Sequence, residues 1–253
     1  MAEEKPSELV ENIKTIFVAL LIALVIRAFL FQPFNIPSGS MLPTLLVGDY
    51  LFVSKYAYGY SRHSFPFSPN IFSGKIWADE PARGDIAVFK LPSDGDTDYI
   101  KRVIGLPGDR IQMRGGVLYI NDQAVPHVQI GDYTEKDLAG NVAQARQYRE
   151  SLPGGVSHNV LDIMLNGPAD DTGIFTVPQG HVFMMGDNRD NSSDSRVASG
   201  GVGFVPMENL VGRAEFLFFS TDGSARLWEF WRWFQAARFE RMFRTIDAIQ
   251  EKG

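Results

Sequence analysis

The chain has 253 residues, and its 24 basic and 30 acidic side chains give a formal net charge of -6, which argues against a protein that binds nucleic acid through bulk positive charge. Hydrophobic residues make up 45% and charged residues 21%, so the chain is not a disordered acidic protein. Cysteine is absent, which excludes thiol nucleophiles, thiolate zinc sites and disulfides, and the four histidines leave few candidates for a histidine-based triad.

Residues 13–31 (IKTIFVALLIALVIRAFLF) form one apolar segment that follows a polar tail over residues 1–12. Its length is near the lower limit for a membrane-spanning helix, and the long side chain of Arg27 can reach the interface from the last turn. A cleaved signal peptide is disfavoured, because the tail is rich in glutamate and the segment runs directly into FQPFNIPSGS. A buried helix of a soluble protein is the second alternative. We favour a retained transmembrane anchor, whose orientation the basic residues indicate only weakly.

Between residues 34 and 222, short apolar runs are separated by Gly, Pro, Asn and Asp, as in GDIAVFKLP and GVLYIND. Most runs alternate and are rich in Val, Ile, Phe and Tyr, which is typical of strands joined by turns. We therefore predict a mainly β fold with an antiparallel catalytic core. Residues 120–175 are more polar and less regular, and we interpret them as a small subdomain inserted between strands of that core.

The tail over residues 226–250 returns to a helical pattern, with three of the four tryptophans and several arginines. Apolar residues recur at helical spacing, which predicts an amphipathic helix. An aromatic, arginine-rich helix suits a membrane interface. Packing of the same helix on its own domain or on a partner explains the pattern equally well.

Nucleophile candidates are few, and the most distinctive is the PSGSMLPTL segment, in which Ser38 and Ser40 lie two residues apart. A serine hydroxyl needs a base, and a turn or a helix cap is the simpler explanation of these serines. A lysine with a lowered pKa is one suitable base. Lys90 and Lys101 both lie in strand-like runs, and local sequence does not choose between them.

The GDNRDNSSDSR segment over residues 186–196 concentrates charge after an apolar strand. It matches the first half of a calcium loop, but Ser195 stands where the sharp turn needs glycine, and Gly201 where the bidentate glutamate belongs. We therefore favour a network of Asp–Arg pairs that braces a buried polar site.

Taken together, these segments resemble bacterial type I signal peptidase, a membrane-bound Ser-Lys endopeptidase. The similarity lies in six motifs that occur in the family's order after an N-terminal anchor: PSGSMLPTL (37–45), GDYLFVSKYAYG (48–59), RGDIAVFKLP (83–92), DYIKRVIGLPGDRI (98–111), GDNRDNSSDSR (186–196) and GFVP (203–206). They cover about a quarter of the chain, and their order and spacing imply most of residues 13–220.

The resemblance implies a role for each matching residue. Ser40 matches the nucleophile and Lys101 the general base, which favours Lys101 over Lys90. Ser192 matches the hydroxyl that positions the lysine amine. Ser38 matches the side-chain donor of the oxyanion hole, with the backbone N–H of Ser40 as the second donor. Bracing polar positions are matched by Arg102, Asp187, Arg189, Asp194 and Arg196. Positions that line the substrate pockets are matched by Phe34, Ile36, Met41, Leu45, Tyr99 and Ile100.

The same resemblance implies the function. We expect removal of signal peptides from exported preproteins at small-x-small (Ala-x-Ala) sites, with no cofactor, no metal and no nucleic acid. We expect a monomer in the lipid bilayer of the bacterial cytoplasmic (inner) membrane, single-pass, with its catalytic domain on the extracytoplasmic (periplasmic) side. Two rivals are a self-cleaving repressor-type Ser-Lys peptidase, which would need an N-terminal DNA-binding domain, and a non-catalytic membrane-tethered β domain.

Overall fold

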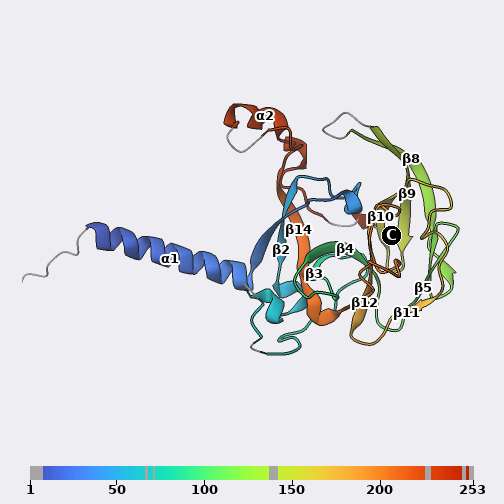
Figure 1. Cartoon of the computed structure of the whole chain (residues 1–253), viewed down its shortest axis with the longest axis horizontal. Helices are drawn as coiled ribbons and strands as arrows, with labels where there is room; N and C mark the ends of the chain where they lie inside the picture. The colour runs from blue at the N-terminus through green and yellow to red at the C-terminus, as the bar shows by residue number, and fades with distance from the viewer. Residues whose placement is uncertain are drawn as a thin grey trace, which may run out of the picture.

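A long N-terminal helix, α1 (Glu8–Phe29), projects away from a body made almost entirely of antiparallel strands (Figure 1). The computed structural model describes residues 8–65, 68–70, 72–136, 142–225, 229–246 and 249–250. Within α1, the 21 residues Leu9–Phe29 are long and apolar enough to cross a membrane, and the body buries none of the 18-residue apolar window within them; Ala28, in the last turn, is buried. At a rise of about 1.5 Å per residue, the span measures about 31 Å, close to the thickness of a bilayer core. This exposure argues against a buried helix of a soluble protein.

The larger sheet holds seven strands within the described residues, in the order β1-β2-β14-β3-β4-β12-β13, and every ladder is antiparallel. This confirms the predicted mainly antiparallel β fold. Its strands are β1 (Phe31–Asn35), β2 (Asp49–Ser54), β14 (Leu210–Ser220), β3 (Ile86–Lys90), β4 (Asp98–Gly105), β12 (His181–Met185) and β13 (Phe204–Pro206).

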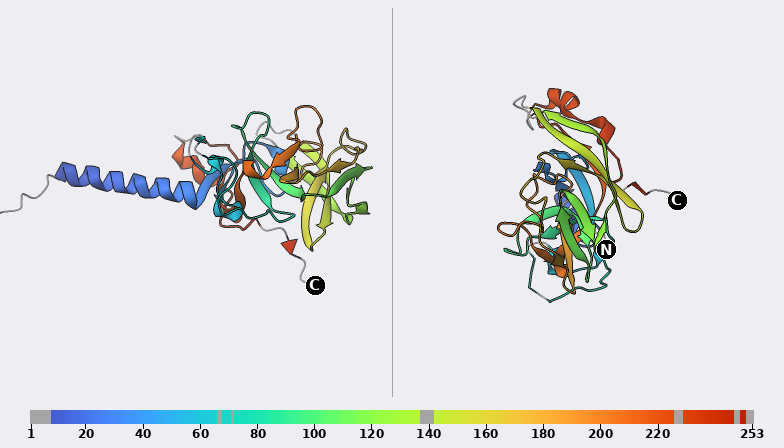
Figure 2. Two further views of the ribbon diagram at one scale, coloured as in Figure 1. Left: turned by 90° about the horizontal axis from the view of Figure 1, so that it is seen from below. Right: turned by 90° about the vertical axis from the view of Figure 1, so that its right-hand side faces the viewer.

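Two smaller sheets come from the chain between β4 and β12, which are neighbours in the larger sheet, with one further strand, β15, added from the C-terminal tail. One sheet has the order β15-β10-β9-β8, and the other has the order β11-β5-β6-β7. Their strands are β15 (Ile249–Gln250), β10 (Val156–Asp162), β9 (Val142–Leu152), β8 (His127–Lys136), β11 (Phe175–Thr176), β5 (Arg110–Arg114), β6 (Val117–Ile120) and β7 (Gln123–Ala124). Figure 2 shows this part of the molecule at the end opposite α1.

The polar and less regular sequence of residues 120–175 forms regular structure in its central part. β8 and β9 form a long hairpin with continuous pairing apart from one bulge near Gly131. The segment is polar because much of the hairpin faces solvent; even Val128 is 62% exposed. Polarity there reflects exposure and not a lack of regular structure.

Alternation along the strands produces the core next to the serine segment. In β2, Leu51 and Val53 point inward and are 0% exposed, whereas the ring of Phe52 packs at 4.4 Å from that of Phe218 on the other face. Met41 and Leu45 join the same inward cluster. The serine segment between β1 and β2 is therefore fixed by apolar packing on the larger sheet.

Over the described part of the tail, residues 229–246 and 249–250, the single amphipathic helix predicted for residues 226–250 is not formed; residues 226–228 and 247–248 lie outside the described residues. Helix α2 (Trp233–Ala236) has four residues, flanked by short 3₁₀ turns at Phe230–Arg232 and Phe239–Arg241. The main chain of this tail instead hydrogen-bonds to the half of β14 that extends beyond β3, for example from the Leu217 N–H to the Arg244 carbonyl at 2.9 Å. An unpaired strand edge offers a row of such bonds, and these override the helical pattern.

Candidate active site

The serine segment places Ser40 within a 3₁₀ turn, Gly39–Met41, between β1 and β2. Ser40 is 8% exposed, and it follows Ser38, whose side chain does not cap the turn. The two hydroxyl oxygens lie 3.5 Å apart. Ser40 therefore does not act as the helix cap that local sequence allowed, and its hydroxyl faces the interior of the site.

Lys101 lies in β4, opposite Ala87 of β3, and is 3% exposed. Its Nζ donates to Oγ of Ser40 at 2.6 Å and to the carbonyl of Ile100 at 3.1 Å. Burial lowers the pKa of the Lys101 ammonium from 10.5 to about 8, against the opposing effect of the carboxylates of Asp194 and Asp187. A buried amine with this pKa has a substantial neutral fraction near physiological pH.

Lys90, the alternative base, lies at the end of β3 and faces a different environment. Its Nζ contacts Oδ1 of Asp98 at 3.0 Å and donates to the carbonyl of Asp96 at 2.5 Å. These contacts hold the amine among acceptors outside the serine segment. The geometry thus selects Lys101 as the lysine that contacts Ser40.

Ser192 lies beside the pair, on the other side of Gly186. A Cβ at position 186 would clash with both Oγ of Ser192 and the carbonyl oxygen of Ser40. The Ser192 hydroxyl oxygen is buried without a well-formed hydrogen bond in the described structure, and it helps to lower the pKa of the Asp194 carboxyl. No hydrogen bond joins Ser192 to Lys101 among the described contacts, so its expected positioning role stays a prediction.

Arg102, the residue after the lysine, points to the opposite face of β4 and forms the central brace. Its guanidinium forms a bidentate ion pair with Asp187, in which Nε donates to Oδ1 at 2.8 Å and Nη2 donates to Oδ2 at 2.6 Å. Nη1 donates to the Gly84 carbonyl at 2.8 Å. Thr44 donates to the same carboxylate at 2.5 Å. Because Thr44 is four residues after Ser40, this brace ties the serine segment to β4.

A second brace stabilises the loop after β12. Arg196 pairs with Asp194 through Nε at 3.0 Å and Nη2 at 2.9 Å, and the same carboxylate accepts the N–H of Gly186 at 3.0 Å. Arg196 also donates to the carbonyl of Arg189 at 2.6 Å. The five bracing residues expected from the sequence therefore all take part in buried ion pairs.

Sequence reasoning missed the acidic partner of Arg189, which is Glu150 from β9. Both side chains are buried, and the pair is bidentate, with Nη1 to Oε1 at 2.7 Å. His158 lies between this pair and the brace, with Nε2 3.6 Å from Glu150 and 3.8 Å from Asp187. Burial, together with the charge of Arg102, lowers the pKa of His158 to about 3, so this imidazole is neutral near pH 7.

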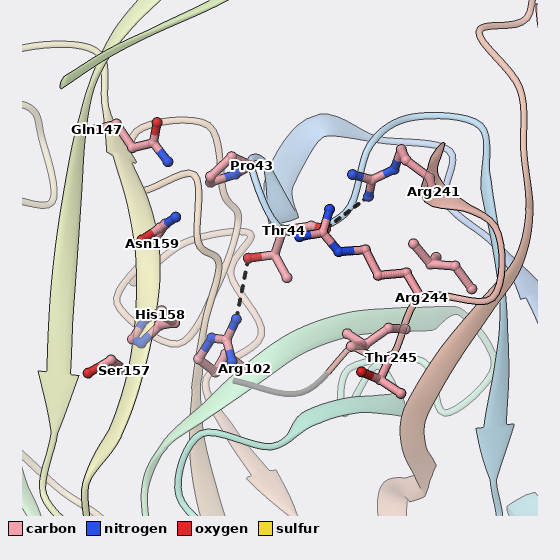
Figure 3. A pocket seen from close by; sticks show the side chains of 12 residues that line it. Pro43, Thr44, Arg102, Gln147, Ser157, His158, Asn159, Arg241, Arg244 and Thr245 are labelled. Carbon is pink, nitrogen blue, oxygen red and sulfur yellow. Dashed lines mark hydrogen bonds between the residues drawn. The ribbon is translucent and has the colours of Figure 1, made fainter. Parts of the chain in front are cut away.

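A cavity of about 250 Å³ opens beside the Arg102 brace, between Thr44, β10 and the tail (Figure 3). Arg241 from the tail donates through Nη2 to the Thr44 carbonyl at 3.0 Å and to Asp49 at 2.6 Å. The tail therefore holds the chain that follows the serine. Arg241 had no signal in the sequence beyond the charge of its segment.

The six residues expected to line substrate pockets divide by exposure. Ile36, Met41 and Leu45 are buried in the core, and they support the site from behind. The other three keep partial exposure: Phe34, Tyr99 and Ile100. The Tyr99 ring lies 5.5 Å from Nζ of Lys101. An apolar wall around the amine supplies the desolvation that lowers its pKa.

Comparisons with known proteins find one matching family and several similar proteins. The family model described as signal peptidase, peptidase S26, matches residues 9–219. Signal peptidase I of Rickettsia typhi is 41% identical over 248 residues, covering 91% of this chain and 91% of that protein. Signal peptidase I of Rickettsia akari is 40% identical over 250 residues, covering 91% of this chain and 90% of that protein. A crystal structure of a signal peptidase I from Enterococcus faecalis is 30% identical with a TM-score of 0.30, and the match covers 53% of this chain and 97% of that chain.

These matches define the chain as a hydrolase of the serine endopeptidase class. The chain belongs to the signal peptidase family, peptidase S26, which confirms the resemblance that its motifs carried.

Proposed function

We propose that the chain removes signal peptides from exported preproteins after small-x-small sequences, with Ser40 as the nucleophile and neutral Lys101 as the general base. The observation that carries this proposal is the 2.6 Å contact between Nζ of Lys101 and Oγ of Ser40. The family of the chain supports the substrate class. The described residues around the pair supply both the desolvation and the bracing that such chemistry needs.

Acylation follows from the protonation states of the pair. Oγ of Ser40 attacks the scissile carbonyl while its proton moves to the neutral amine of Lys101. The resulting ammonium then protonates the leaving amine as the C–N bond breaks. Lys101 is neutral again at that point, and it takes a proton from the water that hydrolyses the acyl-enzyme. The ammonium formed in that step returns its proton to Oγ of Ser40 as the ester C–O bond breaks, so one lysine acts as base and then as acid in each of the two steps.

The oxyanion requires donors close to the attacked carbonyl. Ser38 is well placed, because its hydroxyl oxygen lies 3.5 Å from that of Ser40. Together with the backbone N–H of Ser40, it would hold the negative charge, each donor contributing roughly 3–4 kcal/mol by comparison with other acyl-transfer sites. Ser192 is assigned to hold the Lys101 amine, which its burial next to Gly186 favours.

We attribute the selection of substrate side chains to the partly exposed apolar residues near Ser40 and Lys101. Phe34, Ile36 and Ile100 belong to one apolar cluster behind Ser40, and Met41 and Leu45 fill it from within. Tyr99 borders the amine from the other side. Such walls accept Ala, Gly or Ser and exclude bulky side chains, which fits an Ala-x-Ala site.

The proposed location is based on the candidate membrane span in α1. We assign α1 as a single transmembrane anchor in the bacterial cytoplasmic membrane, with its N-terminus in the cytoplasm and the β body on the extracytoplasmic side, as a monomer that uses no cofactor. The exposed apolar surface of the helix supports this assignment. Protease added to intact spheroplasts should digest the β body; a body that is digested only after lysis would reverse the orientation.

The purified full chain tests the chemistry on a secreted precursor. Ser40→Ala and Lys101→Ala are each expected to slow cleavage by on the order of 10³-fold or more. Lys90→Ala is the matched control, since this lysine is paired with Asp98 and away from Ser40. Cleavage at the wild-type rate by Ser40→Ala, or loss of cleavage in Lys90→Ala alone, would refute the assignment.

A further inference from the structure

A cavity of about 580 Å³ lies at the junction between the last turns of α1 and the larger sheet. One wall is formed by Ala23, Leu24 and Arg27 of α1. The opposite wall includes Lys55, which directly follows β2, together with His63 and Lys90. The lining also includes the carboxylates of Asp96 and Asp98, of which Asp98 is paired with Lys90. The cavity thus combines an apolar wall from the helix with three basic side chains and two acidic ones at the level where the helix ends.

Lys55 is buried without a carboxylate partner among the described residues. It is 2% exposed, and its Nζ donates to the carbonyl of Ser64. Burial, and then the charge of Arg27, lower the pKa of Lys55 to about 8, against the weaker opposing effect of Asp98. Buried lysines are rare unless they are paired, so this amine indicates a missing anion.

Arg27 presents a second basic group to the same cavity. It lies in the last turn of α1, is exposed, and forms no ion pair within the described ranges. Lys90, which also borders the cavity, differs because it is already held by Asp98 at 3.0 Å. Among the described residues, Arg27 and Lys55 therefore face this space without an ion pair, although Asp96 and Asp98 also line it.

We infer that this cavity binds the phosphodiester group of a glycerophospholipid, with Arg27 and Lys55 contacting the phosphate and Ala23 and Leu24 contacting the start of an acyl chain. The inference rests on α1 as the membrane anchor of the proposed function. A helix that spans about 30 Å of hydrocarbon ends at the depth of the lipid phosphates. Leu24 is 55% exposed, so the apolar wall of the cavity continues into the lipid-facing surface of α1.

A free phosphate shares the anionic chemistry of the headgroup. The apolar wall distinguishes the two sources, because a free phosphate gains nothing from Ala23 and Leu24. A bound phospholipid would also join α1 to the β body through Arg27 and Lys55. It would thereby fix the height of the body above the bilayer.

Native mass spectrometry of the full chain in detergent tests the site with three probes: phosphatidylglycerol, diacylglycerol and inorganic phosphate. We expect one retained phosphatidylglycerol per chain, and no retained diacylglycerol. Arg27→Gln should lower retention about tenfold, because it removes a charge-assisted contact. Lys55→Gln should do the same, and Arg27→Gln carries the test if the buried substitution prevents folding. Arg114→Gln, on the remote strand β5, is the matched control.

Three results would overturn the inference: equal retention by Arg27→Gln and wild type, equal retention of diacylglycerol, or displacement of the phospholipid by millimolar inorganic phosphate. Anchoring is measured separately, from sedimentation of the wild-type chain with carbonate-washed membranes. A chain that sediments but shows no selective retention refutes the lipid site alone. A chain that fails to sediment refutes the anchor and the lipid site together.

Discussion

Cleavage by this chain is expected to rise with pH and to reach its half-maximal rate near pH 8. Only the neutral amine of Lys101 can accept the Ser40 proton, and burial lowers the pKa of this ammonium from 10.5 to about 8. The rate therefore follows the neutral fraction of one side chain. At pH values well below this midpoint, the rate should fall tenfold for each pH unit.

The magnitude follows from the two pKa values. With a pKa of about 8, roughly one Lys101 in ten is neutral at pH 7. With the ordinary value of 10.5, about one in three thousand would be neutral. Burial thus raises the population of the active base about 300-fold, which corresponds to about 3 kcal/mol.

The assay is kcat/KM for the purified full chain from pH 5.5 to 10.5, at constant ionic strength, with a substrate that carries no titrating group near the scissile bond. Lys90→Ala should give the same midpoint, because that lysine does not contact Ser40. A midpoint near pH 10–11 would show that the base is a solvated lysine. A rate that does not rise with pH over this range would show that no lysine acts as the base.

Three further predictions concern the supporting structure. Lys101→Met should abolish cleavage yet raise the free energy of unfolding at pH 7 by about 2–3 kcal/mol, because the amine has a lower pKa in the folded chain than in the unfolded chain. This gain in stability should shrink toward pH 10. Equal gains at pH 7 and pH 10 in denaturant titrations would contradict the prediction. Asp187→Asn should cost about 3–5 kcal/mol by leaving Arg102 buried without its carboxylate, and a loss below 1 kcal/mol would argue against the brace. Gly186→Ala should reduce kcat at least about tenfold, because its Cβ clashes at the site, whereas Gly173→Ala, which meets open space, should not.

The strands could be predicted from the sequence. In segments such as the one containing Leu51 and Val53, alternation along the chain indicates that one face of the strand is buried. The choice between Lys90 and Lys101 was not predictable from local sequence, because both lie in similar strands. The antiparallel register of β3 and β4 decides which amine reaches Ser40. That register depends on the whole sheet.

The sequence also failed to predict an ion pair and the path of the tail, for related reasons. Glu150 in β9 pairs with Arg189 in the turn after β12, and an acidic residue in a polar segment has the same local pattern whether it is solvated or buried. The tail has helical periodicity, but the free edge of β14 and the ion pair between Arg241 and Asp49 fix it in a mostly non-helical path. Long-range pairing overrides local propensity in both cases.

The claim that Ser40 and Lys101 act as one catalytic unit is tested most directly by a double-mutant cycle. The measured quantity is kcat/KM above the uncatalysed rate for Ser40→Ala, Lys101→Ala and the double variant. If the lysine acts only through the serine proton, the double variant should be as slow as either single variant. Losses that add on a logarithmic scale would show that the two residues act independently and would contradict the mechanism.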